Sequence, residues 1–147
     1  MVATIDKRPA DQRPARAIQP FHAALLAATI PPFLGGLLSD IAYAMSYEIQ
    51  WSNFASWLGA GGVFLTGFVL LWAFIDLVRA GWRQRRQLVY FLVVLATFVL
   101  GFVNSLVHAR DAWASMPYGL ILSAFVTVLA ILATWLGFSS LRVGAMK

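Results

Sequence analysis

Four long apolar stretches follow one another along the chain, and short polar segments separate them. The stretches cover residues 21–45, 54–78, 88–107 and 118–138. At about 1.5 Å per residue, each is long enough to cross a hydrocarbon layer about 30 Å thick as an α-helix. Helices are expected because, inside lipid, every backbone N–H and C=O group must be hydrogen-bonded within the protein. The pattern predicts an all-α protein, a four-helix transmembrane bundle formed by one membrane domain, residues 21–141.

The first stretch is interrupted in its middle by Pro31-Pro32 and Gly35-Gly36. Proline has no N–H, so carbonyls one turn earlier lose their donors, and we expect the helix to kink or open there. In lipid the freed carbonyls require partners from neighbouring helices or water, which predicts that the break faces the bundle. A second interpretation takes the basic N-terminus, the apolar stretch and Ala42-Tyr43-Ala44 as a secretory signal with its cleavage site. The position of Asp40 and the length of the basic tail favour a membrane span.

The segments between the stretches suit a membrane surface. Residues 46–53 are predicted to form a short polar turn with aromatic anchors for the headgroup zone, and residues 79–87 and 109–117 form the other connections. Small residues recur near helical spacing in the second stretch, which allows a neighbouring backbone to approach closely. They are Ala55, Gly59, Gly62 and Thr66. We therefore expect this face to pack against another helix.

Composition agrees with a lipid environment. Hydrophobic residues make up 61% of the 147 residues, charged residues make up 12%, and the mean hydropathy is +0.76. The charged share is about half that of a soluble domain. The absence of cysteine excludes disulfides, thiolate metal sites and a cysteine nucleophile. The chain also lacks a metal-binding spacing such as HExxH, so we predict no metal site and do not favour an enzyme.

The positive charge is concentrated in segments that the predicted topology places on one side of the membrane. Ten of the 11 Lys and Arg residues lie in the N-terminal tail (1–20), the connection 79–87 or the C-terminal tail (142–147). Cytoplasmic segments carry such an excess, so we expect both termini in the cytoplasm and a multi-pass protein of the cell inner membrane. The N-terminal tail is expected to be disordered until it meets anionic lipid. The net charge of +5 therefore needs no nucleic acid as a partner.

Five polar side chains at or near membrane depth are candidates for proton handling or ligand binding. Towards the outer side, Asp40 has Asn104 and His108 at its level, and the last two share a helix face because they are four residues apart. This group can hold a proton, bind a cation or orient a ligand, or it can be a hydrogen-bonded tie between helices; both interpretations stay open. Towards the inner side lie His22 and Asp76.

Local pairing is the favoured interpretation of two other features. Asp76 precedes Arg79 by three residues, which permits an interfacial ion pair on one helix face. Hydroxyl side chains recur along the fourth stretch, at Ser123, Thr127 and Thr134. Such groups usually bond back to carbonyls of their own helix, so we do not expect them to line a path.

The two histidines, His22 and His108, raise the question of haem. His22 begins the first stretch on the inner side and His108 ends the third on the outer side, roughly a membrane thickness apart. One haem ligated by both within a chain is therefore disfavoured, and a metal site built from both is excluded. No cofactor is predicted; a haem b held by a single histidine, or shared between protomers, stays as a minor alternative.

The order of these residues resembles a bacterial family of small four-helix membrane proteins known only as a domain of unknown function. The resemblance covers about residues 21–138 and includes a Gly-rich second stretch. It is carried by His22, Asp40, Asp76 and His108. Similar members usually begin with His-Pro and have a second His five residues later, whereas this chain has Ala23 and Ala27 there. Such proteins are sometimes encoded beside or fused to periplasmic oxidoreductases and cytochromes, so the resemblance implies an anchoring or electron-handling role.

Three function classes follow, all of them in a lipid bilayer. A membrane subunit or anchor for a partner protein, such as a periplasmic redox protein, is favoured by the small-residue faces and the lack of a catalytic set. A proton or small-solute transporter would use the interrupted first helix and the two acid–histidine levels. Four short spans leave it little room unless it forms a homo-oligomer. A haem- or quinone-binding electron-transfer subunit is the third class.

Overall fold

The computed structural model describes residues 20–81 and 84–144, with side chains described as far as Ser139. These residues form helices and no strand, which confirms the all-α prediction. The helices are α1 (Pro20–Ala28), α2 (Ile30–Ser46), α3 (Ile49–Ala80), α4 (Arg85–His108), α5 (Ala112–Ser115) and α6 (Tyr118–Gly144). Almost all of the predicted disordered tail, residues 1–20, lies outside the described residues, as do residues 145–147.

Four segments of the described chain are long and apolar enough to cross a membrane, which confirms the predicted number of spans. They are Pro20–Ser46, Ile49–Ala80, Arg85–His108 and Tyr118–Ser139. The helices extend beyond the apolar stretches: α3 begins at Ile49, so the polar turn expected over residues 46–53 contains only Tyr47 and Glu48. Helical backbone hydrogen bonds do not depend on side-chain polarity, so a helix continues where its side chains become polar.

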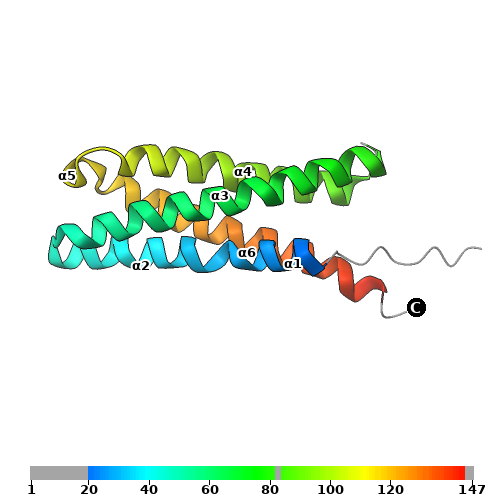
Figure 1. The fold of residues 1–147 in the computed structure, drawn as a ribbon, viewed down its shortest axis with the longest axis horizontal. Helices are drawn as coiled ribbons and strands as arrows, with labels where there is room; N and C mark the ends of the chain where they lie inside the picture. Colours follow the sequence, from blue (N-terminus) through cyan, green and yellow to red (C-terminus); the bar gives the residue numbers. More distant parts are fainter. Residues whose placement is uncertain (1–19, 82–83, 145–147) are drawn as a thin grey trace, which may run out of the picture.

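The spans lie side by side and alternate in direction (Figure 1). α2 packs against α3 and α6, and α4 packs against the same two helices, so the spans close into a four-membered bundle. α1 continues the first span along α3 and α6. Short connections between antiparallel neighbours produce this up-and-down order. We call the end that carries α5 and the α2–α3 turn the α5 end, and the opposite end the α1 end.

The first span is interrupted at Thr29, between α1 and α2. Thr29 keeps right-handed helical angles (φ −73°, ψ −27°), so the interruption is local. Pro31 and Pro32 lie in the first turn of α2, where a missing N–H costs little because that turn's amides have no partner inside their own helix. The Leu26 carbonyl oxygen accepts hydrogen bonds from Thr29 Oγ1 (2.7 Å) and from Thr134 Oγ1 on α6 (3.4 Å). Hydroxyl groups inside the bundle therefore supply partners at the break.

Gly35 and Gly36 do not interrupt the helix, contrary to expectation, because α2 runs through both. They allow α3 to approach closely instead. A Cβ on Gly36 would lie 3.7 Å from the Ala55 carbonyl oxygen and 3.8 Å from the Gly59 nitrogen, and one on Gly35 would lie 3.1 Å from Leu58 Cδ1. Glycine weakens a helix interior by only about 1 kcal/mol, which close packing against α3 offsets.

Between the two ends of the bundle, most of the buried side chains are apolar. Its two buried apolar clusters are Leu26, Val69, Val94 and Ala133, and Phe33, Val126 and Ala130. Phe33, only 3% exposed, lies against two glycines: a Cβ on Gly62 would be 2.6 Å from Phe33 Cε1, and one on Gly101 would be 3.4 Å from it. The ring fits between α3 and α4 because neither helix has a side chain at these positions.

Candidate functional site

A buried polar cluster joins three of the four spans at the α5 end. Asp40 on α2 is 0% exposed, and its carboxyl group lies between α4 and α6. Oδ1 is 2.8 Å from His108 Nε2, and Oδ2 accepts a hydrogen bond of 2.5 Å from the Ser123 hydroxyl. Asn104 Nδ2 donates to Ser123 Oγ (2.9 Å). We call Asp40, Asn104, His108 and Ser123 the α5-end cluster.

The bundle's topology brings these residues together. Asp40 lies in the last two turns of α2, His108 is the last residue of α4, and Ser123 lies in the second turn of α6. The helices α2 and α4 both end where α6 begins (Figure 1), so these three residues lie at one level of the bundle. Gly119 allows the imidazole to lie against the α6 backbone, since a Cβ there would be 2.9 Å from His108 Cε1. Ser56 on α3 donates a long hydrogen bond (3.4 Å) to the His108 carbonyl oxygen, so the remaining span, α3, also contacts the cluster.

The hydrogen bonds define where protons lie in this cluster. His108 Nδ1 is 2.9 Å from the Asn104 carbonyl oxygen, which can only accept, so Nδ1 carries a proton. The contact between Nε2 and Asp40 Oδ1 then requires one further proton, on the imidazole or on the carboxyl group. The pair is imidazolium and carboxylate in the first case and two neutral groups in the second. Both arrangements have no net charge, which suits a group buried at membrane depth.

The structure brings together Asp40, Asn104 and His108, which the sequence placed at one level. Sequence reasoning missed Ser123, which was expected to bond to its own helix. Thr127 does so, donating to the Ser123 carbonyl oxygen (2.7 Å), but the Ser123 hydroxyl donates to Asp40 on another helix. The sequence did contain one signal for Ser123. It lies about as far from the start of its span as Asp40 lies from the end of its own, which places both residues at a similar membrane depth.

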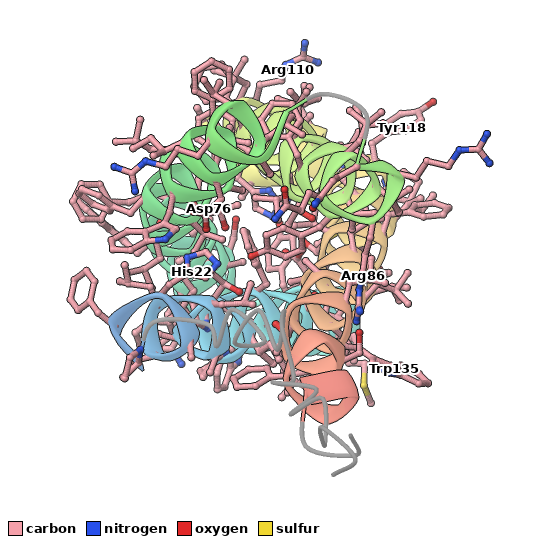
Figure 2. All side chains as sticks on the ribbon, turned by 90° about the vertical axis from the view of Figure 1, so that its right-hand side faces the viewer. His22, Asp76, Arg86, Arg110, Tyr118 and Trp135 are labelled. Carbon is pink, nitrogen blue, oxygen red and sulfur yellow. The ribbon has the colours of Figure 1, made fainter. Side chains whose placement is uncertain are left out.

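A second polar group lies at the α1 end. His22 on α1 is 4% exposed, and its Nε2 is 2.9 Å from the Tyr90 hydroxyl on α4. Trp72 on α3 stacks on the imidazole, with ring centroids 5.7 Å apart and planes at 27°. Asp76, one turn further along α3, lies close enough to act electrostatically on His22 and Tyr90, and Figure 2 shows Asp76 and His22 both pointing into the bundle. We call these four residues the α1-end cluster.

Asp76 and Arg79 do not form the ion pair that their spacing permits. In the described part of the chain, the only pair of opposite charges within 4.0 Å is His108 and Asp40. The Asp76 side chain points into the bundle, whereas Arg79 is exposed. The basic connection contributes a different contact at this end, where Arg86 Nη2 donates to Ser139 Oγ on α6 (3.0 Å).

His22 and His108 lie at opposite ends of the bundle, so a single haem cannot be ligated by both within one chain. Both ring nitrogens of His108 are engaged, whereas His22 Nδ1 is buried with no hydrogen-bond partner in the part of the chain that the structure describes. Within residues 20–81 and 84–144, no group of three or more His, Cys, Asp or Glu side chains is placed to hold a metal ion.

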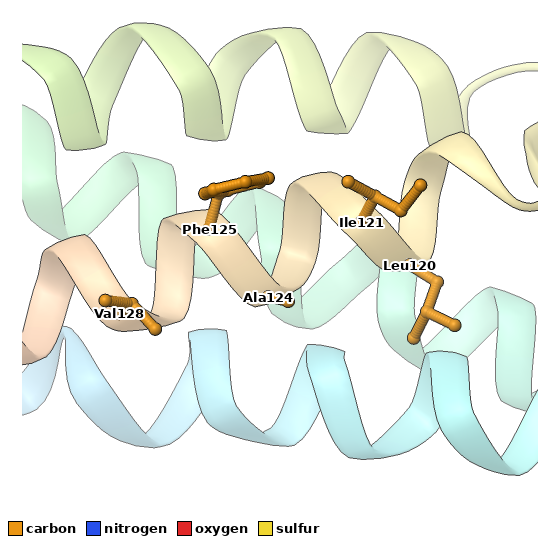
Figure 3. A pocket seen from close by; sticks show the side chains of 5 residues that line it. All are labelled: Leu120, Ile121, Ala124, Phe125 and Val128. Carbon is orange, nitrogen blue, oxygen red and sulfur yellow. The ribbon is translucent and has the colours of Figure 1, made fainter.

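An open groove on the surface of α6 is separate from both clusters. Apolar side chains alone line it (Figure 3): Leu120, Ile121, Ala124, Phe125 and Val128. Phe125 is largely exposed there. Such a surface suits lipid acyl chains and offers no polar group to a substrate.

Comparison with known families agrees with this architecture. The family model described as predicted membrane protein (DUF2231) matches residues 18–142. The chain belongs to DUF2231. The match confirms the resemblance to a membrane family of unknown function. No curated protein and no solved structure matches the chain.

The α5-end cluster of this DUF2231 protein can keep one proton between Asp40 and His108 and can tie α2, α4 and α6 together. Its polar side-chain atoms are hydrogen-bonded within the chain except Asn104 Oδ1, which is buried without a partner among residues 20–81 and 84–144. Exchange of the shared proton with water therefore requires the cluster to open.

Proposed function

We propose that this DUF2231 protein is a multi-pass subunit of the bacterial inner membrane that anchors a partner protein, with a periplasmic redox protein as the expected partner. The closed interior is the observation that carries this proposal. Phe33 and the two apolar clusters lie between the α1-end and α5-end clusters. The buried threonines between them donate to backbone carbonyls one turn earlier in the chain: Thr29, Thr66, Thr97 and Thr127 (2.7, 2.7, 2.8 and 2.7 Å). The described interior therefore supplies no polar path across the membrane.

Charge distribution supports an orientation with both termini in the cytoplasm and the α5 end in the periplasm. Arg79, Arg85 and Arg86 are exposed at the α1 end, whereas Arg110 lies beside α5. Positive residues of short loops favour the cytoplasmic side.

The α5 end also offers an aromatic surface. The exposed rings of Tyr47 and Trp113 lie 5.7 Å apart, although they come from different connections. Tyr47 adopts a left-handed conformation (φ 56°) at the end of α2, with its amide donating to the Tyr43 carbonyl oxygen (2.8 Å). Aromatic residues are enriched at protein interfaces, so we assign this surface to the partner.

Site-specific photocrosslinking in native membranes tests the anchoring role. A photoreactive phenylalanine analogue replaces Trp113 (72% exposed) or, as the matched control, Phe125 in the apolar groove (61% exposed). We expect a defined protein adduct from position 113 and lipid adducts alone from position 125. Lipid adducts alone from both positions would contradict the anchoring role.

Proton movement is the second candidate, favoured by the proton that Asp40 and His108 share. Liposomes that contain only the purified chain and an internal pH-sensitive dye distinguish the two functions. An anchor leaves the rate of acidification at the level of empty liposomes. Acidification that depends on the chain and is lost in Asp40→Asn would assign transport to the α5-end cluster.

A further inference from the structure

The α1-end cluster contains a buried hydrogen-bonding atom that the fold leaves unused. His22 is 4% exposed, and its Nε2 is engaged by Tyr90, but Nδ1 has no partner among the described residues. Burying a polar atom without a hydrogen bond is unfavourable, and most such atoms in folded proteins are satisfied by protein, water or ligand. Nδ1 is therefore available to a molecule that binds at the α1 end.

Its contact with Tyr90 allows His22 Nδ1 to be either a hydrogen-bond donor or a hydrogen-bond acceptor. If the Tyr90 hydroxyl donates to Nε2, then Nδ1 carries the ring proton and can donate to a ligand carbonyl. If Nε2–H donates to the Tyr90 oxygen, then Nδ1 is an acceptor for a ligand hydroxyl. The His22 imidazole can therefore change tautomer while the Tyr90 hydroxyl rotates. Nδ1 can then bind either a ligand carbonyl or the hydroxyl that forms when this carbonyl is reduced.

The surroundings of His22 are aromatic, which suits a flat ring. Trp72 stacks on His22, and Tyr90 meets the imidazole edge-on, with ring centroids 6.1 Å apart and planes at 80°. Phe21, 63% exposed, packs against Trp72 with centroids 6.3 Å apart, so these two rings lie between His22 and the lipid.

We propose that the α1-end cluster binds the head group of a lipid-soluble quinone or quinol, with His22 Nδ1 bonded to one ring oxygen and Trp72 stacked on the ring. The ring enters from the lipid by displacing the exposed Phe21 side chain. The Asp76 side chain points into the bundle beside this site and forms no ion pair within the described residues. Binding of this ligand is independent of the anchoring role.

Nitrogen NMR of the purified full-length chain tests the site directly, because the chain has only two histidines. The protein is labelled with ¹⁵N-histidine, placed in lipid nanodiscs and titrated with decylubiquinone. We expect a saturable change in the Nδ1 resonance of His22 and no change at His108, which is the internal control. Unchanged His22 resonances at saturating quinone, or equal changes at both histidines, would overturn the proposal.

A single variant, His108→Gln, assigns both sets of resonances, so the experiment does not depend on a His22 variant that folds. Trp72→Leu supplies a second measurement. Loss of the stacked ring is expected to weaken quinone binding about two- to tenfold. Tyr118→Leu, which removes an exposed aromatic ring at the α5 end, is the matched control and leaves the affinity unchanged. Equal affinities for the Trp72 variant and the wild-type chain would exclude the proposed stacking.

Discussion

Replacing Asp40 with asparagine tests whether the α5-end cluster needs a charge or only its hydrogen bonds. In the neutral arrangement, Asp40 donates to His108 Nε2 and accepts from Ser123. An asparagine of the same shape does both, since its Nδ2 donates to the imidazole and its oxygen accepts from the hydroxyl. We therefore expect Asp40→Asn to change the free energy of unfolding by less than about 1 kcal/mol.

Asp40→Ala removes both contacts and provides the contrast. Hydrogen bonds between membrane helices contribute about 0.6 to 1.7 kcal/mol each, so the loss of the bonds to His108 and Ser123 predicts a destabilisation of about 1 to 3 kcal/mol. The cavity left by the carboxyl group adds to this loss, because Asp40 is fully buried.

The assay is reversible unfolding by SDS in mixed micelles, followed by circular dichroism. Asp76→Ala is the matched control, and we expect a change below about 1 kcal/mol because that half-buried side chain forms no ion pair with any residue that the structure describes. If Asp40→Asn destabilised the chain as much as Asp40→Ala, the neutral arrangement would be wrong and the cluster would depend on an imidazolium–carboxylate pair. If Asp40→Ala left stability unchanged, the cluster would not tie the helices together.

Two further predictions concern packing and topology. Gly62→Ala places a Cβ against the Phe33 ring and is expected to destabilise the bundle by about 1 to 3 kcal/mol in the same assay. The control is Gly61→Ala, which has no neighbouring atom within 4 Å of the added Cβ and is expected to be neutral or stabilising by up to about 1 kcal/mol. Equal effects of the two substitutions would refute the tight fit of Phe33. Because the chain has no cysteine, the single-cysteine variants Gln84→Cys and Ala112→Cys can each be labelled at one known position. A membrane-impermeant maleimide added to intact spheroplasts should modify position 112 alone. Modification of both positions would refute the predicted topology.

Much of the fold follows from the sequence because lipid imposes a simple rule. Apolar segments of about 20 residues must be helical, so the number and approximate position of the spans could be predicted from hydropathy. The lengths of the helices could not, since α3 begins five residues before the apolar stretch and takes in most of the expected polar turn. The effect of glycine was also misjudged at Gly35 and Gly36, because their conformational cost is outweighed by contacts with α3 that only the packed bundle shows.

The candidate residues were predicted to different extents. Asp40, Asn104 and His108 could be grouped because alternating spans of known length set the depth of each residue. Ser123 was missed because depth does not reveal which side of a helix faces the axis. The same limitation applies to Tyr90 and Trp72, whose contacts with His22 depend on the rotation of α3 and α4 about their own axes.

The sequence by itself therefore determined the membrane setting, the helical class, the separation of the two histidines and the asymmetry of positive charge. These properties depend on residue type and on distance along the chain, which no packing arrangement can alter. The tertiary structure alone decided that Asp40 shares a proton with His108, that Phe33 closes the middle of the bundle and that one nitrogen of His22 has no partner in the described part of the chain. Hydrogen bonds between helices require a particular rotation and spacing of each helix, and these are set by the fit of side chains across the whole interior.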